Sequence, residues 1–228
     1  MHITEAFYNS SWQQPILLWI FPFIFLFAQF KNKFQASSVF VTRYTAFFTV
    51  SIILDAWLSA YNILGIGTVA PGVNSILSFI FIWLGDFRYV LLAEYYLVPE
   101  KSFSKAMMKA VPITFIIPLL SAFLIKKVLA TDNGRVLYVV YEGLFVLLAF
   151  IYLARISKAN ISEETAKKLK KFTQFVVLYY GLWAGVDVLM LISDHESVLN
   201  IFAWGLRVLP NLLYYWVFVP LAYNLFKK

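Results

Sequence analysis

The chain alternates long apolar runs with short polar segments. Seven runs have about the length that an α-helix needs to cross the hydrocarbon core of a bilayer. They cover residues 14–30, 42–64, 75–97, 107–125, 136–156, 172–192 and 198–226. Only short connections remain between them. The pattern therefore predicts a single transmembrane domain over residues 1–228, an all-α bundle of seven transmembrane helices.

The composition supports a chain that faces lipid. Hydrophobic residues make up 61% of the sequence and charged residues 14%, whereas soluble domains carry about 25% charged residues. There is no cysteine, and the two histidines, His2 and His195, fall in a predicted tail and loop. Disulfides and thiol catalysis are therefore excluded, and a zinc site would lack its usual ligands. We expect no metal and no cofactor.

The distribution of Lys and Arg predicts the orientation. Among the predicted loops and tails, one side of the membrane receives only Lys126, Lys127 and Arg135. The opposite side receives Lys31, Lys33, Arg43, Lys101, Lys105, Lys109, Arg155, Lys158, Lys167, Lys168, Lys170, Lys171, Lys227 and Lys228. Because cytoplasmic loops carry the excess of positive charge, this places the N-terminus outside and the C-terminus inside. The sequence thus predicts a multi-pass protein of the cell membrane.

The net charge of +7 is then explained by contact with the bilayer. Basic loops beside a membrane bind anionic lipid headgroups, and no basic soluble face is present that would indicate nucleic-acid binding. The basic segment at residues 160–171 is also a candidate docking site for an acidic cytoplasmic partner. Asn160 and Glu163 have capping-box spacing, so the sixth helix is expected to begin in the cytoplasm, before the membrane.

Several ionisable residues interrupt the apolar runs. Each costs at least about 2.5–3.5 kcal/mol to insert near the centre of a membrane helix, so each needs a partner or a function. Helical spacing aligns Asp55 with Ser51 and Ser59, and it aligns Trp183 with Asp187. The residues predicted to bind a ligand or ion are Asp55, Asp86, Arg88, Glu142, Trp183, Asp187, Arg207 and Asn211.

Two interpretations of these residues remain open. In the first, the acids form structural ion pairs with Arg88 and Arg207 and hold helices together. In the second, the excess of acids over arginines leaves a carboxyl that binds a proton, a cation or a ligand amine. Glu94, nearer the cytoplasmic end, is interpreted as a snorkelling interfacial residue or as part of a second gate with Tyr95 and Tyr96.

The topology and two short motifs resemble the microbial rhodopsins. Arg88-Tyr89 in the third helix resembles the family's Arg-Tyr pair, and a Gly/Pro-containing external loop precedes it. In the last helix, residues 206–211 (LRVLPN) resemble the family's Leu-Asp-Val-Ser-Ala-Lys stretch. The resemblance implies a seven-helix scaffold of that kind.

Three substitutions depart from the rhodopsin pattern. Asn211 stands where the family has its retinal-binding lysine, and Leu91 and Arg207 stand at the two counter-ion positions. Without the lysine amine, a retinal Schiff base cannot form there. The resemblance therefore implies the scaffold without retinal photochemistry.

The sequence leaves two classes of function. The first is a sensor or carrier of a small polar solute, a cation or protons, which would use the intramembrane charges. The alternative is a structural or partner-binding subunit of a membrane complex. An enzyme is not expected, because no Gly-x-Ser-x-Gly motif and no pair of metal-ligand residues is present.

Overall fold

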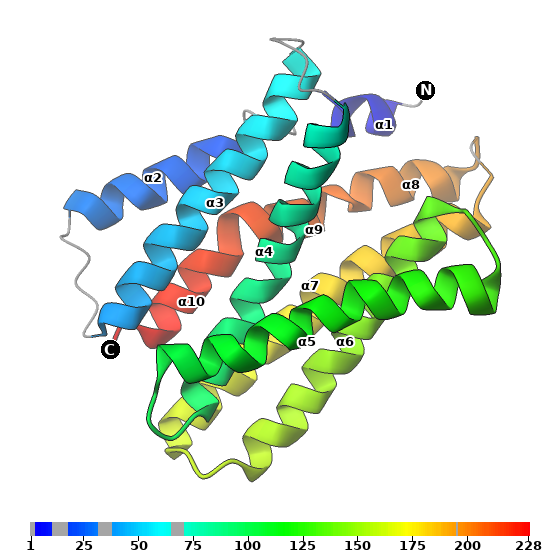
Figure 1. Ribbon diagram of the computed structural model, residues 1–228. Helices are drawn as coiled ribbons and strands as arrows, with labels where there is room; N and C mark the ends of the chain where they lie inside the picture. The colour runs from blue at the N-terminus through cyan, green and yellow to red at the C-terminus, as the bar shows by residue number, and fades with distance from the viewer. Residues whose placement is uncertain (1–2, 11–17, 32–37, 65–70, 195) are drawn as a thin grey trace. The chain divides into compact units, whose positions relative to one another are not determined.

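The computed structural model describes residues 3–10, 18–31, 38–64, 71–194 and 196–228, and every regular element within these ranges is a helix (Figure 1). The prediction of an all-α protein is confirmed for this part of the chain. His2, His195, Lys33, the predicted helix start at residues 14–17, and most of the predicted loops 31–41 and 65–74 lie outside the described residues.

The helices follow one another with short connections. In chain order they are α1 (Ile3–Tyr8), α2 (Leu18–Lys31), α3 (Val39–Leu64), α4 (Pro71–Leu97), α5 (Phe103–Phe123), the π-helix η2 (Leu124–Leu129), α6 (Gly134–Lys158), α7 (Glu163–Ile192), α8 (Val198–Leu206), α9 (Val208–Leu212), the π-helix η3 (Leu213–Val217) and α10 (Phe218–Phe226).

Four stretches of the described residues are helical, long and apolar enough to cross a membrane. They are Val39–Ala56, Phe103–Leu129, Gly134–Lys158 and Glu163–Ile192, and a shorter apolar helix covers Trp19–Lys31. Much of the surface of these helices is apolar, with Phe150 and Ile151 of α6 and Leu178 of α7 among the exposed side chains. Large exposed apolar faces of this kind are what a lipid-facing helix requires.

Serine caps begin α5 and α7 earlier in the chain than the apolar runs predict. α5 begins at Phe103, because the Ser102 side chain accepts a hydrogen bond from the Lys105 backbone N–H at 3.4 Å. α7 begins at Glu163, and its cap is Ser162, whose hydroxyl accepts from the backbone N–H of Thr165. The prediction that Asn160 caps this helix is therefore wrong, although an early start was expected.

The seventh predicted helix is not continuous. Residues 198–226 form α8, α9, η3 and α10, with Arg207 between the first two. Pro210 supplies the physical reason, because proline lacks the N–H that would bond to the carbonyl of Leu206, and its ring clashes with that carbonyl. The π-helical turn of η3 follows directly after α9.

The chain divides into two compact units. Unit 1 comprises Met1–Gly85 and Asn211–Lys228, and unit 2 comprises Asp86–Pro210. The chain passes from one to the other inside α4, after Gly85, and again inside α9, after Pro210. The single transmembrane domain over residues 1–228 stays a prediction.

Unit 2 is built on the second half of α4 and on α5 to α8. α6 packs along α7, and the short connection Ala159–Ser162 makes the two helices antiparallel (Figure 1). Phe145 and Ala149 of α6, Val176 of α7 and Leu92 of α4 have no exposed surface. Because these side chains form an apolar middle layer, the polar groups of unit 2 fall into two sets, one toward each end.

α5 differs from its neighbours in carrying two internal prolines, Pro112 and Pro118. Near the two prolines, the hydroxyls of Thr114 and Ser121 donate hydrogen bonds to backbone carbonyls of the same helix. Thr114 donates to the Ala110 carbonyl at 2.9 Å, and Ser121 donates to the Ile117 carbonyl at 2.8 Å. Such bonds let hydroxyl groups stay satisfied inside an apolar helix.

In unit 1, α3 packs against α2 and α10. The Trp19 indole N–H donates to the Ile53 carbonyl at 2.8 Å, which ties α2 to α3. The stacked rings of Phe21 and Trp216, 5.3 Å apart, join α2 to η3. Aromatic packing thus fixes the elements that carry the polar residues of this unit.

Candidate functional site

Asp187 of α7 is shared by two arginines. Arg135, at the start of α6, places Nη1 3.0 Å from Oδ1 of Asp187, and Arg207, at the end of α8, places Nη1 3.6 Å from the same oxygen. The Asp187 side chain is 1% exposed, whereas those of Arg135 and Arg207 are 33% and 18% exposed. The carboxylate is therefore buried beneath two cations that reach the surface of unit 2.

Two tryptophans hold these arginines. The Arg207 guanidinium lies 5.2 Å from the ring centre of Trp183 and 5.7 Å from that of Trp204, and Arg135 lies 5.5 Å from Trp204. Cation–π contacts at such distances stabilise a guanidinium over an aromatic face. Trp183 therefore belongs to this site through Arg207.

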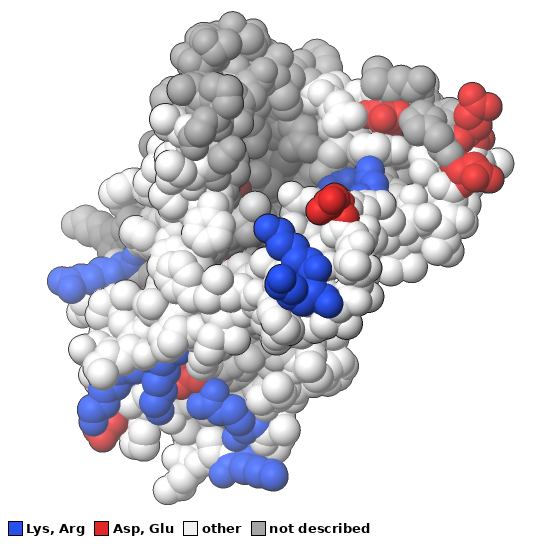
Figure 2. Space-filling view, turned by 45° about the vertical axis from the view of Figure 1, so that its right-hand side comes forward, with Lys and Arg blue, Asp and Glu red and all other residues white. Residues whose placement is uncertain are grey.

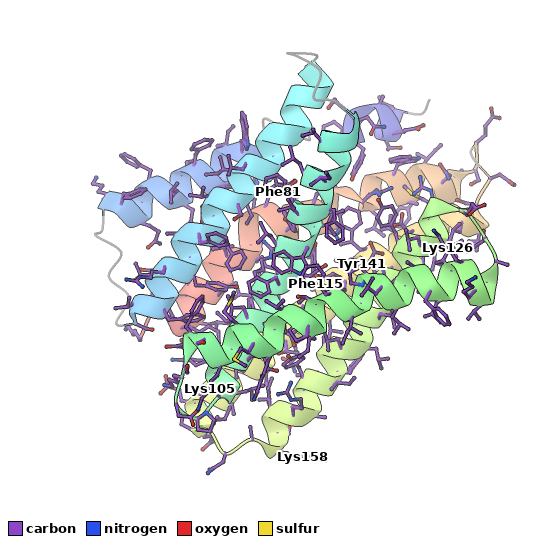
Figure 3. All side chains as sticks on the ribbon, in the orientation of Figure 1. Phe81, Lys105, Phe115, Lys126, Tyr141 and Lys158 are labelled. Atoms are coloured by element: carbon purple, nitrogen blue, oxygen red, sulfur yellow. The ribbon has the colours of Figure 1, made fainter. Side chains whose placement is uncertain are left out.

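Glu142 lies on α6 two turns after Arg135. Its side chain is buried, with 7% exposed surface, and none of the described residues donates a hydrogen bond to it or forms an ion pair with it. It lies close enough to Asp187, Arg207 and Asp86 to interact with each electrostatically. Figure 3 labels its chain neighbour Tyr141 between the end of unit 2 marked by Lys105 and Lys158 and the end marked by Lys126.

Asp86 and Arg88 come from α4. The Tyr180 hydroxyl of α7 donates a hydrogen bond to Oδ1 of Asp86, and Arg88 interacts electrostatically with the same carboxyl. Both side chains are buried, with 4% and 1% exposed surface. The hydrogen bond joins α4 to α7, so Asp86 is positioned by a helix other than its own.

Six charged residues of unit 2 form one group, which we call the Asp187 group. Its members are Asp86, Arg88, Arg135, Glu142, Asp187 and Arg207. The excess of acids predicted from the sequence disappears here, because Asp55 belongs to unit 1 and Arg135, predicted to lie in the outer loop, adds a third cation.

The other two predicted site residues belong to unit 1. Asp55 accepts a hydrogen bond from the Tyr215 hydroxyl at 3.2 Å, and Asn211 donates to the Tyr8 hydroxyl at 3.1 Å. The side chain of Ser59, expected beside Asp55, lies outside the described residues. Six predicted residues, including Trp183, thus lie in unit 2 and two in unit 1.

Glu94 forms a separate buried pair toward the other end of unit 2. Its side chain has no exposed surface, accepts from the Tyr152 hydroxyl at 2.6 Å, and accepts from Nη1 and Nη2 of Arg155 at 2.5 and 3.3 Å. The snorkelling interpretation of Glu94 is therefore wrong. The sequence analysis missed Arg155 as the partner of Glu94. Its guanidinium lies 4.8 Å from the ring centre of Tyr152. The sequence shows only that Tyr152 and Arg155 share a helix face, and it does not show that this face meets Glu94.

Lysines gather on the exposed surface at this same end, and Figure 2 shows basic side chains along its lower edge. Exposed members are Lys101, Lys105, Lys109, Lys158, Lys167 and Lys171. Glu100, between α4 and α5, pairs with Lys105 at 3.0 Å, and this hydrogen bond lowers the pKa of the Glu100 carboxyl.

Within the described residues, the fold and this site define an all-helical protein whose apolar helices are compatible with a membrane. Its second unit gathers six charged residues, of which Asp86, Arg88, Glu142 and Asp187 are buried. Among the residues that the structure describes, no three His, Cys, Asp or Glu side chains gather in a way that could hold a metal ion. No family model, no curated protein and no solved structure matches the chain.

Proposed function

We propose that this chain is a seven-span protein of the cell membrane, with its N-terminus outside and its C-terminus inside, that acts as a sensor or carrier. The Asp187 group would bind a small polar solute, a cation or a proton. The seven apolar runs and the asymmetry of Lys and Arg support the topology. The scaffold would resemble the microbial rhodopsins without retinal, since Asn211 binds Tyr8 where the family has its lysine.

Glu142 is the observation that carries this proposal. An ionised carboxylate buried without a hydrogen-bond donor is costly, and a carboxyl in that position gains most by taking up a proton or a cation. Asp187 and Asp86 have partners in the structure, so their role in packing is already accounted for. Glu142 accepts no hydrogen bond and forms no ion pair with any of the described residues.

Infrared spectroscopy of the reconstituted protein tests whether Glu142 exchanges a proton. Between about pH 6 and about pH 11, we expect the carbonyl stretch of protonated carboxyls to disappear in the wild type. Glu142→Gln should remove part of that band, because the amide cannot titrate while the buried carboxyl of Asp86 remains. Asp132→Asn, which changes an exposed acid just before α6, should keep it.

A second measurement separates a carrier from a sensor. Proteoliposomes with a trapped pH dye and an imposed pH gradient should show proton entry that Glu142→Gln reduces at least about tenfold, a typical loss for a positioned proton-transfer group. Proton binding without flux would favour a sensor. A titrating band and a flux that are both unchanged in Glu142→Gln would contradict the proposal.

A partner-binding subunit is the second candidate, favoured by the basic start of α7. Lys167, Lys168, Lys170 and Lys171 lie within its first turns, at least partly accessible, and Glu164 binds Lys168 at 2.6 Å. An acidic cytoplasmic protein would bind such a surface through charge complementarity. Reversing the four lysines to glutamate should abolish copurification of that partner, and Lys126→Glu/Lys127→Glu should not. A partner retained by both variants would exclude this surface.

A further inference from the structure

We propose that the Asp187 group takes up a small carboxylate together with a proton, with Arg135 as the main carboxylate ligand and Glu142 as the proton acceptor. This proposal rests on the proposed function, because it names the solute of the same site. It concerns unit 2 alone, and each residue that it uses lies within Asp86–Pro210.

The charge balance of the site supports coupled uptake. When all six side chains are ionised, three acids face three arginines, and the group is neutral. A proton on Glu142 leaves one positive charge in excess. Uncompensated charge is unfavourable inside a low-dielectric bundle, and a monovalent anion restores neutrality. The proton and the anion therefore stabilise each other in the site.

The arginines that flank Asp187 are suited to a carboxylate. A guanidinium presents five N–H donors in a planar fork that matches a carboxylate in two-point contact. The ion pair with Asp187 engages Nη1 of Arg135, and one third of the Arg135 side chain is exposed. The Arg135 guanidinium also lies 5.5 Å from the ring centre of Trp204, in cation–π contact. A carboxylate can thus reach Arg135 from the surface, while Asp187 holds the arginine from within.

Glu142 is placed to regulate this anion site. The titratable and charged groups around it are Asp86 of α4, Tyr179 and Asp187 of α7, and Arg207 after α8. α5 also packs against α6, but none of its described residues interacts electrostatically with Glu142. Arg207 is therefore the cation whose charge an ionised Glu142 offsets. Protonation of Glu142 removes this offset and strengthens the attraction for an anion.

The structure favours a proton over a metal cation as the co-bound species. A proton needs one carboxyl, whereas hard cations need several oxygen ligands arranged around one point. No such arrangement of three acidic side chains occurs in the described ranges. Glu142 alone, buried and without a hydrogen-bond donor among those residues, is sufficient for the proton.

Acetate binding to the purified full-length protein in detergent tests the proposal. With carbon-13-labelled acetate followed by NMR line broadening, we expect the wild type to bind at least about fivefold more tightly at about pH 7 than at about pH 10, within the usual range of coupling between two sites. Acetate stays ionised over this range. Glu142→Gln should bind at about pH 10 as the wild type does at about pH 7, without pH dependence.

Three further variants locate the anion. Arg135→Gln should weaken acetate binding at both pH values, and Arg135→Lys, which keeps the charge without the fork, should give an intermediate affinity. Asp132→Asn should behave as wild type. The Lys variant keeps the test decisive if the Gln variant does not fold.

Several results would overturn the proposal. They are acetate affinity that does not change with pH in the wild type, a pH dependence that survives in Glu142→Gln, and chloride that competes as well as acetate. If the infrared band depends on Glu142 but acetate does not bind, the proton site stands and the carboxylate is wrong. If the band is also independent of Glu142, the proposed function fails as well.

Discussion

Arg155→Met is expected to lower the free energy of unfolding by about 3 kcal/mol. Removing one partner of a buried ion pair costs about 3–5 kcal/mol, because the remaining charge stays in a low-dielectric environment. Glu94 has no exposed surface, and its two charge-assisted hydrogen bonds come from Arg155. The lower end of the range applies because the Arg155 side chain is 40% exposed and its surroundings already admit water.

The matched controls for Arg155→Met lie close by. Lys158→Met removes an exposed cation from the next turn of α6 and should change the unfolding midpoint in mixed micelles only slightly. The double variant Glu94→Gln/Arg155→Met should recover part of the loss, since a neutral amide is easier to bury. If Arg155→Met unfolds at the same denaturant concentration as the wild type, Glu94 is not held by this ion pair.

The second large effect is expected from the two arginines that share Asp187. Arg135→Gln should cost about 1–2 kcal/mol, because a hydrogen bond to a charged group contributes about 1.5–3 kcal/mol and Arg207 remains in place. Arg207→Gln removes an ion pair of 3.6 Å without a hydrogen bond to Asp187 and should cost no more than that. The double variant leaves Asp187 buried without either cation. Its loss should exceed the sum of the two single losses by at least about 1 kcal/mol, a coupling typical of residues in one network.

A double-mutant cycle measures this coupling directly. The four proteins are compared by unfolding in mixed micelles, and the whole cycle is repeated in an Asp187→Asn background. With a neutral residue at position 187, the coupling should fall close to zero. Additive losses with Asp187 present would show that the two arginines stabilise unit 2 through other contacts, such as those with Trp183 and Trp204.

The helical class and most helix positions follow from the apolar runs alone. Predicted and observed boundaries of the helix that ends at Leu97 agree at its C-terminal end, and the connection before α8 lies where it was expected. Serine caps, Ser102 and Ser162, begin α5 and α7 before their apolar runs, and hydropathy does not detect such caps. Pro210 indicates the break near Arg207, although the apolar run continues through this region and hydropathy alone predicts one helix.

The sequence predicts most of the charged residues of the site, but it does not predict which residue pairs with which. Asp187 and Arg207 were expected inside the bundle because burial of a charge requires a partner. Arg135 was placed outside, since the sequence shows it beside a loop but does not show how far its long side chain reaches back along α6. The pairing of Asp86 with Tyr180 depends on how α4 and α7 pack, and spacing within one helix carries no information about that.

The prolines of α5 have a mechanical consequence for unit 2. Each removes a main-chain hydrogen bond, while α6 and α7 contain no proline and keep an unbroken ladder along their whole length. Bending α5 therefore breaks fewer bonds than bending either neighbour. Within unit 2, α5 is therefore easier to bend than α6 or α7. Thermal bending that changes the distances between these helices will be concentrated in α5.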